Sequence, residues 1–273
     1  MRLMRRLAGA LAVGVLNIIG RLPIKISLAL GSLLLPLYVP FRFRTRAKLR
    51  DLHPPVSAFT YYRMRLRLAL LSVQHALGRP DGCETKVEQG GFFADVLSSG
   101  KPVLLFGWHQ GPVELLHRIP ALTAKDRARF VMTSTAFSPV LAEWMARGRQ
   151  RTGVTVIRPG ETSALRDWTR SHGILAVMVD QVPGAPEEFL SLRGGTVRIP
   201  WPGRFVAWAM TRDPEILVVS TRVTDEGIVF RYDRISSEAL KDSVKDAVGK
   251  LMDAALSKAP GQYNWSYGKI RAR

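Results

Sequence analysis

The sequence of 273 residues is poor in cysteine and in acidic residues. Cys83 is the only cysteine, so the chain has no internal disulfide and no cysteine cluster that could bind zinc. Asp and Glu together number 22 against 40 Lys and Arg, which gives a formal net charge of +18. A surface of this charge requires an anionic partner, and nucleic acid, anionic lipid and an acidic carrier protein are the three usual ones.

Long uninterrupted hydrophobic runs are also missing. Two apolar stretches, 7–20 and 28–41, are separated by cations, and neither reaches the ~18 consecutive apolar residues of a membrane span. The first 70 residues nevertheless contain thirteen cations and a single acid, Asp51. We therefore expect residues 1–57 to form a hydrophobic helical membrane anchor with basic juxtamembrane helices, either as one tilted span or as two helices in the interface. A cleaved signal peptide, helices of a soluble core and a nucleic-acid-binding arm are the alternatives.

From about residue 100 onward, short apolar runs alternate with amphipathic stretches. The apolar runs cover 101–108, 128–134, 153–159, 173–180, 215–223 and 227–233, and the helix-like segments cover 112–119, 137–149, 161–172, 204–211 and 236–258. This alternation predicts an α/β fold with a mostly parallel central sheet flanked by helices, and with the functional residues at the carboxyl ends of the strands. Because there are no repeats and no low-complexity linker, we expect one catalytic domain over residues 58–273.

One apolar run, within "PVLLFGWHQGPVELLHRI" (102–119), ends at a histidine. Gly111 and Pro112 follow His109 and suit the start of a helix, which places Glu114 in its first turn. The Glu114 carboxylate can then reach one imidazole nitrogen, fix the tautomer and leave the other nitrogen as a base for a hydroxyl that attacks a thioester. The alternative is that Glu114 only caps the helix.

The stretch "WHQGPVE" resembles the H-x4-D/E motif of the membrane-bound lipid A biosynthesis acyltransferases. That family includes lauroyl and myristoyl transferases and the related phosphatidylinositol mannoside acyltransferases. Other blocks are similar to this family in the same order along the chain: "LPIKISLALGSLLLPLYV", "LAEWMARGRQRTGVTVI", "SHGILAVMVDQVPG", "RGGTVRIPWPGRFVAWA" and "GQYNWSYGKIRAR". The resemblance implies a glycerolipid-acyltransferase-like α/β fold.

The resemblance also implies roles for five residues. His109 would be the general base on the acceptor hydroxyl, and Glu114 would be the acid that orients it. Arg149 occupies the family's arginine position, where it would pair with site carboxylates or a phosphate; a solvated arginine at a helix end is the alternative. Asp180 would be the acid near the histidine, unless it only starts a turn. Arg158 would bind a phosphate of the acceptor or the carrier.

The activity that the resemblance implies is O-acyl transfer at the cytoplasmic face of the cell inner membrane. A fatty acyl chain would pass from acyl carrier protein or acyl-CoA to a hydroxyl of a lipid A precursor, in lipopolysaccharide biosynthesis, or of a related glycolipid. We expect a monomer without a nucleic-acid partner, with no metal, no cofactor and no covalent acyl-enzyme, and with backbone N–H groups near Gly111 as oxyanion donors. A phosphatidylinositol mannoside or aminolipid acceptor, and a catalytically silent lipid-binding relative, are the alternatives.

Overall fold

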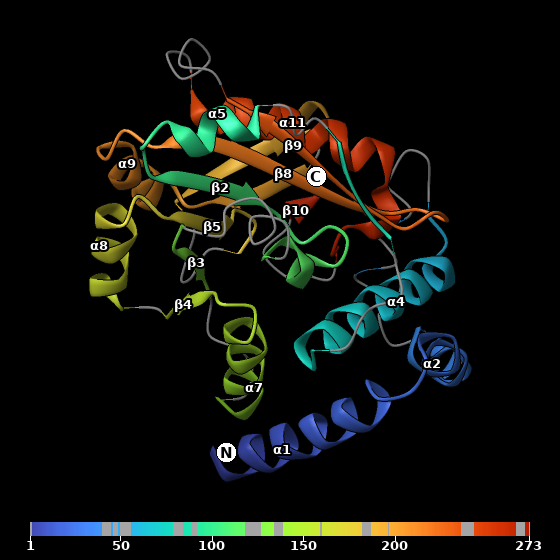
Figure 1. The fold of residues 1–273 in the computed structure, drawn as a ribbon. Helices are drawn as coiled ribbons and strands as arrows, with labels where there is room; N and C mark the ends of the chain where they lie inside the picture. Colours follow the sequence, from blue (N-terminus) through green and yellow to red (C-terminus); the bar gives the residue numbers. More distant parts are fainter. Residues whose placement is uncertain are drawn as a thin grey trace.

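A seven-stranded sheet lies at the centre of the computed structural model (Figure 1). The structure describes residues 2–39, 45, 49, 56–78, 84–88, 92–117, 127–133, 139–158, 160–181, 187–195, 197–235, 243–265 and 271–272. In the order β1-β9-β8-β2-β5-β3-β4, the strands are β1 (Thr85–Glu88), β9 (Ile228–Arg234), β8 (Glu215–Val223), β2 (Val103–Gly107), β5 (Ile174–Met178), β3 (Arg129–Met132) and β4 (Thr155–Ile157). Only the β8–β9 pair is antiparallel among these neighbours, so the expected mostly parallel α/β sheet is confirmed.

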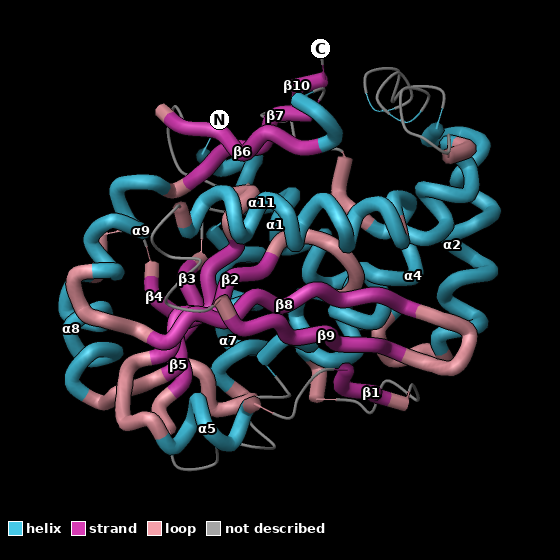
Figure 2. The backbone as a smooth tube through the Cα atoms, turned by 90° about the horizontal axis from the view of Figure 1, so that it is seen from above, coloured by secondary structure: helices cyan, strands magenta, loops and turns pink. Residues whose placement is uncertain are grey.

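Helices cover both faces of this sheet because its inner strands are apolar on both sides. β2 is buried at all five positions, and its alternate residues belong to two separate hydrophobic clusters. One face packs against α8 (Thr162–Arg170), α9 (Gly203–Met210) and α11 (Val244–Lys258), and Figure 2 shows α11 running alongside β8. The other face packs against α5 (Phe93–Ser98), α7 (Pro139–Gln150) and the carboxyl-terminal half of α4 (Ala58–Ala76).

A second, three-stranded antiparallel sheet was not predicted from the sequence. Its order is β10-β7-β6, with β6 (Glu188–Leu192), β7 (Val197–Trp201) and β10 (Arg271–Ala272), and a 3₁₀ turn at Arg193–Gly195 precedes β7. β6 packs against α11. The edge strand β1 was also missed, because it is mostly exposed and carries no alternating apolar pattern.

The two apolar stretches near the N-terminus form α1 (Arg2–Ile19) and α2 (Ile24–Tyr38). α1 packs against α7, and α2 packs against α4, so both lie on the same side of the sheet as these helices (Figure 1). Within the described part of the chain, no helix is both long and apolar enough to cross a membrane. The expected anchor is therefore not supported as a spanning helix.

Two expected helices differ from the structure at their ends. In the described residues, the segment that follows His109 forms a 3₁₀ helix, Val113–His117, in which the Leu115 N–H bonds to the Pro112 carbonyl oxygen three residues earlier, 2.9 Å away. Positions 118 and 119 of the expected helix lie outside the described residues. The last helix begins at Val244, where the Ser243 hydroxyl accepts a hydrogen bond from the Asp246 N–H. The earlier part of the expected helix, 236–242, lies outside the described residues.

Candidate functional site

The register of two neighbouring strands brings His109 to Asp180. β2 and β5 run parallel, with Val103 opposite Ile174 and Gly107 opposite Met178. The parallel pairing of the two segments continues past the ends of the strands, since the Val179 N–H donates to the Gly107 carbonyl oxygen over 2.9 Å. Continued by two more residues, this register places His109 beside Asp180 at the carboxyl ends of both strands.

The Asp180 carboxylate binds His109 with both of its oxygens. Oδ1 lies 2.8 Å from the imidazole Nδ1, and Oδ2 accepts the backbone N–H of His109 over 2.9 Å. The Asp180 side chain is fully buried, whereas 15% of the imidazole is exposed. The carboxylate therefore holds the ring and the backbone together, and it favours the tautomer in which Nδ1 carries the proton. In that tautomer Nε2 is the nitrogen that can take a proton from a substrate.

Glu114, the expected orienting acid, forms an ion pair with Arg149. The guanidinium donates two parallel hydrogen bonds, from Nε to Oε2 and from Nη2 to Oε1, each 2.7 Å long. Both side chains are largely buried, with 12% of Glu114 and 15% of Arg149 exposed. Arg149 thus pairs with the carboxylate of Glu114 and is not a solvated arginine at the helix end. The acid on Nδ1 is Asp180, because the 3₁₀ turn holds Glu114 within reach of α7 and the β2–β5 register brings Asp180 to the ring.

The guanidinium of Arg149 stays charged in this environment. Burial alone lowers its pKa, but the charge of Glu114 and the hydrogen bonds to it outweigh burial, and the net pKa is raised above the ordinary value. A bidentate pair of this kind has a fixed geometry. It therefore ties the turn that follows His109 to the last turn of α7.

Two other expected site groups make contacts elsewhere in this structure. Arg158, at the end of β4, is half exposed and pairs with Glu143 at 2.8 Å and with Glu161 at 4.0 Å. β4 is three strands away from β2, which is roughly 14 Å across a sheet. The expected oxyanion donor, the Gly111 N–H, instead donates to the Gln262 carbonyl oxygen over 3.2 Å.

Gly111 itself is required by a close backbone approach. Its φ of +66° is in the left-handed region, and a Cβ at this position would lie 2.8 Å from the carbonyl oxygen of Thr221. Glycine adopts this backbone conformation at low cost, and it has no Cβ that would collide with the Thr221 carbonyl oxygen. The loop that carries His109 is therefore pressed against the end of β8.

The segment after α11 holds the His109 loop in place, a role that was not predicted. The Asn264 N–H donates to the His109 carbonyl oxygen over 2.9 Å, and Gln110 and Tyr263 form an antiparallel bridge. The Gln262 amide in turn bonds to the N–H and the carbonyl oxygen of Val223, at 2.7 and 2.6 Å. The only feature of the sequence that could have indicated this contact is the stretch "GQYNW", which combines polar and aromatic residues near the C-terminus.

Gln110 links this loop to α11. Its buried side chain accepts a hydrogen bond from the Trp108 indole N–H over 2.7 Å and donates to the Ala255 carbonyl oxygen over 3.2 Å. We expect Gln110→Ala to lower the free energy of unfolding by about 2 kcal/mol, because it leaves the Trp108 N–H buried without its acceptor.

Urea unfolding of the two proteins measures this difference. Gln150→Ala, which alters an exposed glutamine at the end of α7, is the matched control and should be nearly neutral. Equal stability of the Gln110→Ala and Gln150→Ala variants would contradict a structural role for the Gln110 amide.

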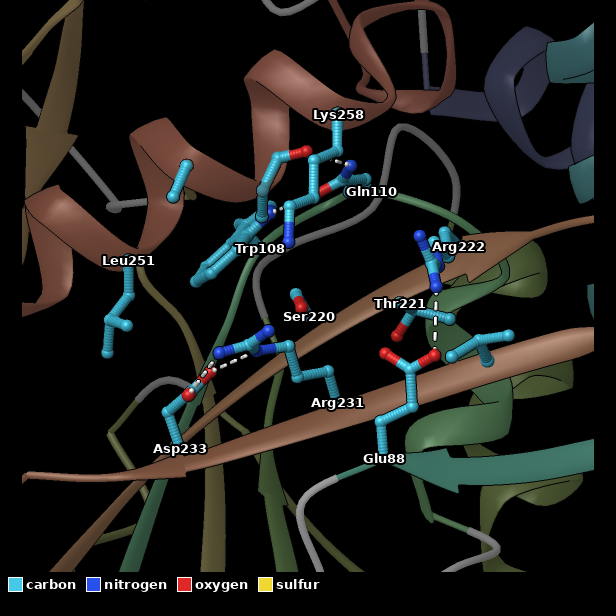
Figure 3. A pocket seen from close by; sticks show the side chains of 13 residues that line it. Glu88, Trp108, Gln110, Ser220, Thr221, Arg222, Arg231, Asp233, Leu251 and Lys258 are labelled. Atoms are coloured by element: carbon cyan, nitrogen blue, oxygen red, sulfur yellow. Dashed lines mark hydrogen bonds and ion pairs between the residues drawn. The ribbon is translucent and has the colours of Figure 1, made fainter.

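A cavity lies between α11 and the central sheet, next to the His109 loop. Trp108 and Gln110, which alternate with His109 along the chain, form part of its wall (Figure 3). Leu251 and other residues of α11 form an apolar side. The opposite rim is polar and carries two ion pairs drawn in the same view, Arg222–Glu88 at 2.9 Å and Arg231–Asp233 at 3.1 Å. The cavity thus contacts the His109 loop through Trp108 and Gln110, and its lining does not include His109 or Asp180.

No protein-family model matches this sequence, and no curated protein matches it. A histidine whose Nδ1 is held by a buried carboxylate can act as a general base and then as a general acid through Nε2. The bidentate Arg149–Glu114 pair supports the adjoining turn.

Proposed function

We propose that this chain is a membrane-associated O-acyltransferase. It moves a fatty acyl chain from acyl carrier protein or acyl-CoA to a hydroxyl of a lipid A precursor or a related glycolipid, at the cytoplasmic face of an inner membrane. The observation that supports this proposal most directly is the His109–Asp180 pair at the carboxyl ends of adjacent parallel strands. It is the position at which open α/β sheets place their functional groups.

The proposed reaction uses the imidazole twice. Nε2 of His109 removes the hydroxyl proton of the acceptor while the hydroxyl oxygen attacks the thioester carbonyl carbon. The tetrahedral oxyanion then collapses, the carbon–sulfur bond breaks, and the thiolate takes the proton back from Nε2. Asp180 stabilises the imidazolium between these steps and keeps Nδ1 protonated throughout.

The charge of the chain suits both substrates. Acyl carrier proteins are acidic, and coenzyme A and a phosphorylated glycolipid carry phosphate groups, so a chain with a net charge of +18 attracts each of them. The proposal assigns residues 58–273 to the acyltransferase domain and residues 1–57 to membrane attachment.

A transfer assay in detergent tests the proposal. The donors are acylated acyl carrier protein and acyl-CoA, each with a radiolabelled acyl chain. Lipid A precursors, phosphatidylinositol mannosides and aminolipids are supplied as separate acceptors. A labelled ester product with one of these pairs, formed only in the presence of the protein, is the expected result. If none of the donor and acceptor pairs gives a product, the lipid-binding alternative replaces the enzyme.

The same assay distinguishes the two carboxylates near His109. In Asp180→Asn the amide has only one acceptor oxygen for the two His109 donors, so its NH₂ group faces the ring or the backbone N–H. When it faces the ring, Nδ1 becomes the acceptor and Nε2 carries the proton, which removes the base. We expect kcat to fall by about 10³-fold or more, as a wrong tautomer does in other histidine–aspartate pairs.

Glu114→Gln is the matched control, since it also replaces a carboxylate by an amide of the same shape. Because the Arg149 guanidinium has Glu114 as its bidentate partner, this change should act mainly on stability and reduce kcat less than Asp180→Asn does. A larger loss of kcat in Glu114→Gln would return the orienting role to Glu114.

A further inference from the structure

The outer sides of α1 and α2 form an apolar surface in the described residues. Nine of the eleven large hydrophobic side chains that are exposed in the described part of the chain belong to these two helices. In α1 they are Leu7, Leu11, Val15 and Ile18, and in α2 they are Ile26, Leu30, Leu33, Leu34 and Leu37. Both sets follow helical spacing, so each helix exposes one apolar stripe.

The inner sides of these helices are fixed to the domain. The Gln74 amide donates to the Leu22 carbonyl oxygen over 3.0 Å, and the Trp144 indole donates to Asn17 over 3.3 Å. Gly20 packs so closely that a Cβ there would lie 2.6 Å from the Leu77 side chain. The exposed stripes therefore belong to a docked surface and not to helices that could turn inward to bury them.

The charges within the N-terminal segment that forms these helices have one sign. Residues 1–50 contain no acid, and Arg21 and Lys25 are exposed at the turn between α1 and α2. An apolar stripe bordered by cations is complementary to an anionic leaflet, whose headgroups attract Lys and Arg while the acyl region takes up the apolar side chains.

The surface also lies on the side of the sheet that carries the proposed site. α1 and α2 pack on α7 and α4, and α7 supplies Arg149 to the Glu114 turn (Figure 1). Glu114 follows His109 by five residues, and its neighbour Leu115 belongs to the same hydrophobic cluster as α4 and α7. A bilayer at α1 and α2 would thus be on the side of the molecule that carries the Glu114 turn.

We propose that α1 and α2 lie in the plane of one leaflet of an anionic bilayer and hold the protein there without crossing it. This inference rests on the membrane association in the proposed function and adds its geometry and its lipid class. The helices have 18 and 15 residues, or about 27 and 22 Å of length, and their exposed apolar residues extend from Leu7 to Ile18 and from Ile26 to Leu37. In this arrangement the acceptor lipid reaches the enzyme from the leaflet to which it is bound.

Flotation of the full-length protein with vesicles tests the lipid class. Vesicles of phosphatidylcholine alone are compared with vesicles that also contain phosphatidylglycerol, and no acyl donor is present. We expect binding to the anionic vesicles to be tighter by about tenfold or more, and to weaken as salt is added. Equal binding to both vesicles, or no binding to either, would overturn the proposal even if acyl transfer in detergent were observed.

The double variant Leu11→Asp/Leu34→Asp tests the surface. Because both side chains are exposed, 71% and 63%, the fold should be unchanged by circular dichroism, while binding to anionic vesicles should fall by about a hundredfold. Val87→Asp, at an exposed apolar residue of β1, is the matched control and should bind normally. Normal binding of the double variant would exclude this surface.

The depth of the helices is measured with a fluorescent label on a cysteine at position 11 or 34, in a Cys83→Ser background, with quenchers at known depths in the lipid. For helices in the plane we expect both labels at similar shallow depths, roughly 5–10 Å into the headgroup and acyl boundary. A label near the bilayer centre would show that the helix crosses the membrane, and would overturn the in-plane geometry.

Discussion

A His109→Ala variant should lose acyl transfer by about 10²- to 10⁴-fold in kcat/KM while keeping its fold, since a positioned general base contributes a factor of this size. Nε2 of His109 is the proton acceptor in the proposed reaction, and alanine leaves the acceptor hydroxyl with water as its only base. The Asp180 carboxylate would still accept the backbone N–H of residue 109, so the buried acid is not left without a partner. Initial rates in the detergent assay, with circular dichroism of the same samples, measure the effect.

The control is a histidine outside the site. His172 is exposed and has a φ of +49°, so asparagine, which tolerates the left-handed region, is a better replacement than alanine. His172→Asn should transfer acyl groups at the natural rate. An activity of His109→Ala within tenfold of the natural protein would mean that this imidazole is not the base, whatever the fate of the fold.

The second large effect concerns stability. Arg149→Met should lower the free energy of unfolding by about 3–5 kcal/mol, because it leaves the Glu114 carboxylate buried without its guanidinium. Urea denaturation measures this loss. Arg147→Met, two residues earlier in α7, removes an arginine that is 70% exposed and pairs with Glu143, and it should cost less than about 1 kcal/mol.

A double variant distinguishes the effect of leaving the Glu114 charge buried and unpaired from the effect of losing the packing contacts of the Arg149 side chain. Glu114→Leu/Arg149→Met removes both charges and keeps apolar side chains of similar length, and a buried ion pair can often be replaced in this way at little cost. The double variant should therefore be more stable than Arg149→Met alone. If the two are equally unstable, the loss arises from packing around α7 and the ion pair is not its cause.

Much of the central sheet was predictable from the sequence because its strands are locally distinct. Runs such as 173–180 and 215–223 are apolar and bounded by glycine or charged residues, and the structure contains β5 and β8 there. β1 was missed because it is mostly exposed and because it pairs with β9, about 140 residues later in the chain. β6 and β7 form a local hairpin, with Leu192 opposite Val197, and they were missed because β7 contains Pro200, a residue that argues against a strand interior.

For the candidate site, the sequence by itself determined which residues were candidates, and the tertiary structure decided how they pair. His109 and Glu114 were identifiable from their places after a strand and at a helix start, and Arg149 and Asp180 from the family resemblance. Their partners were not, because sequence spacing favours contacts within one turn, whereas the parallel register of β2 and β5 joins residues 71 positions apart. The same holds for α1 and α2: the sequence determined their apolar character, but only their packing on α4 and α7 decided which side stays exposed.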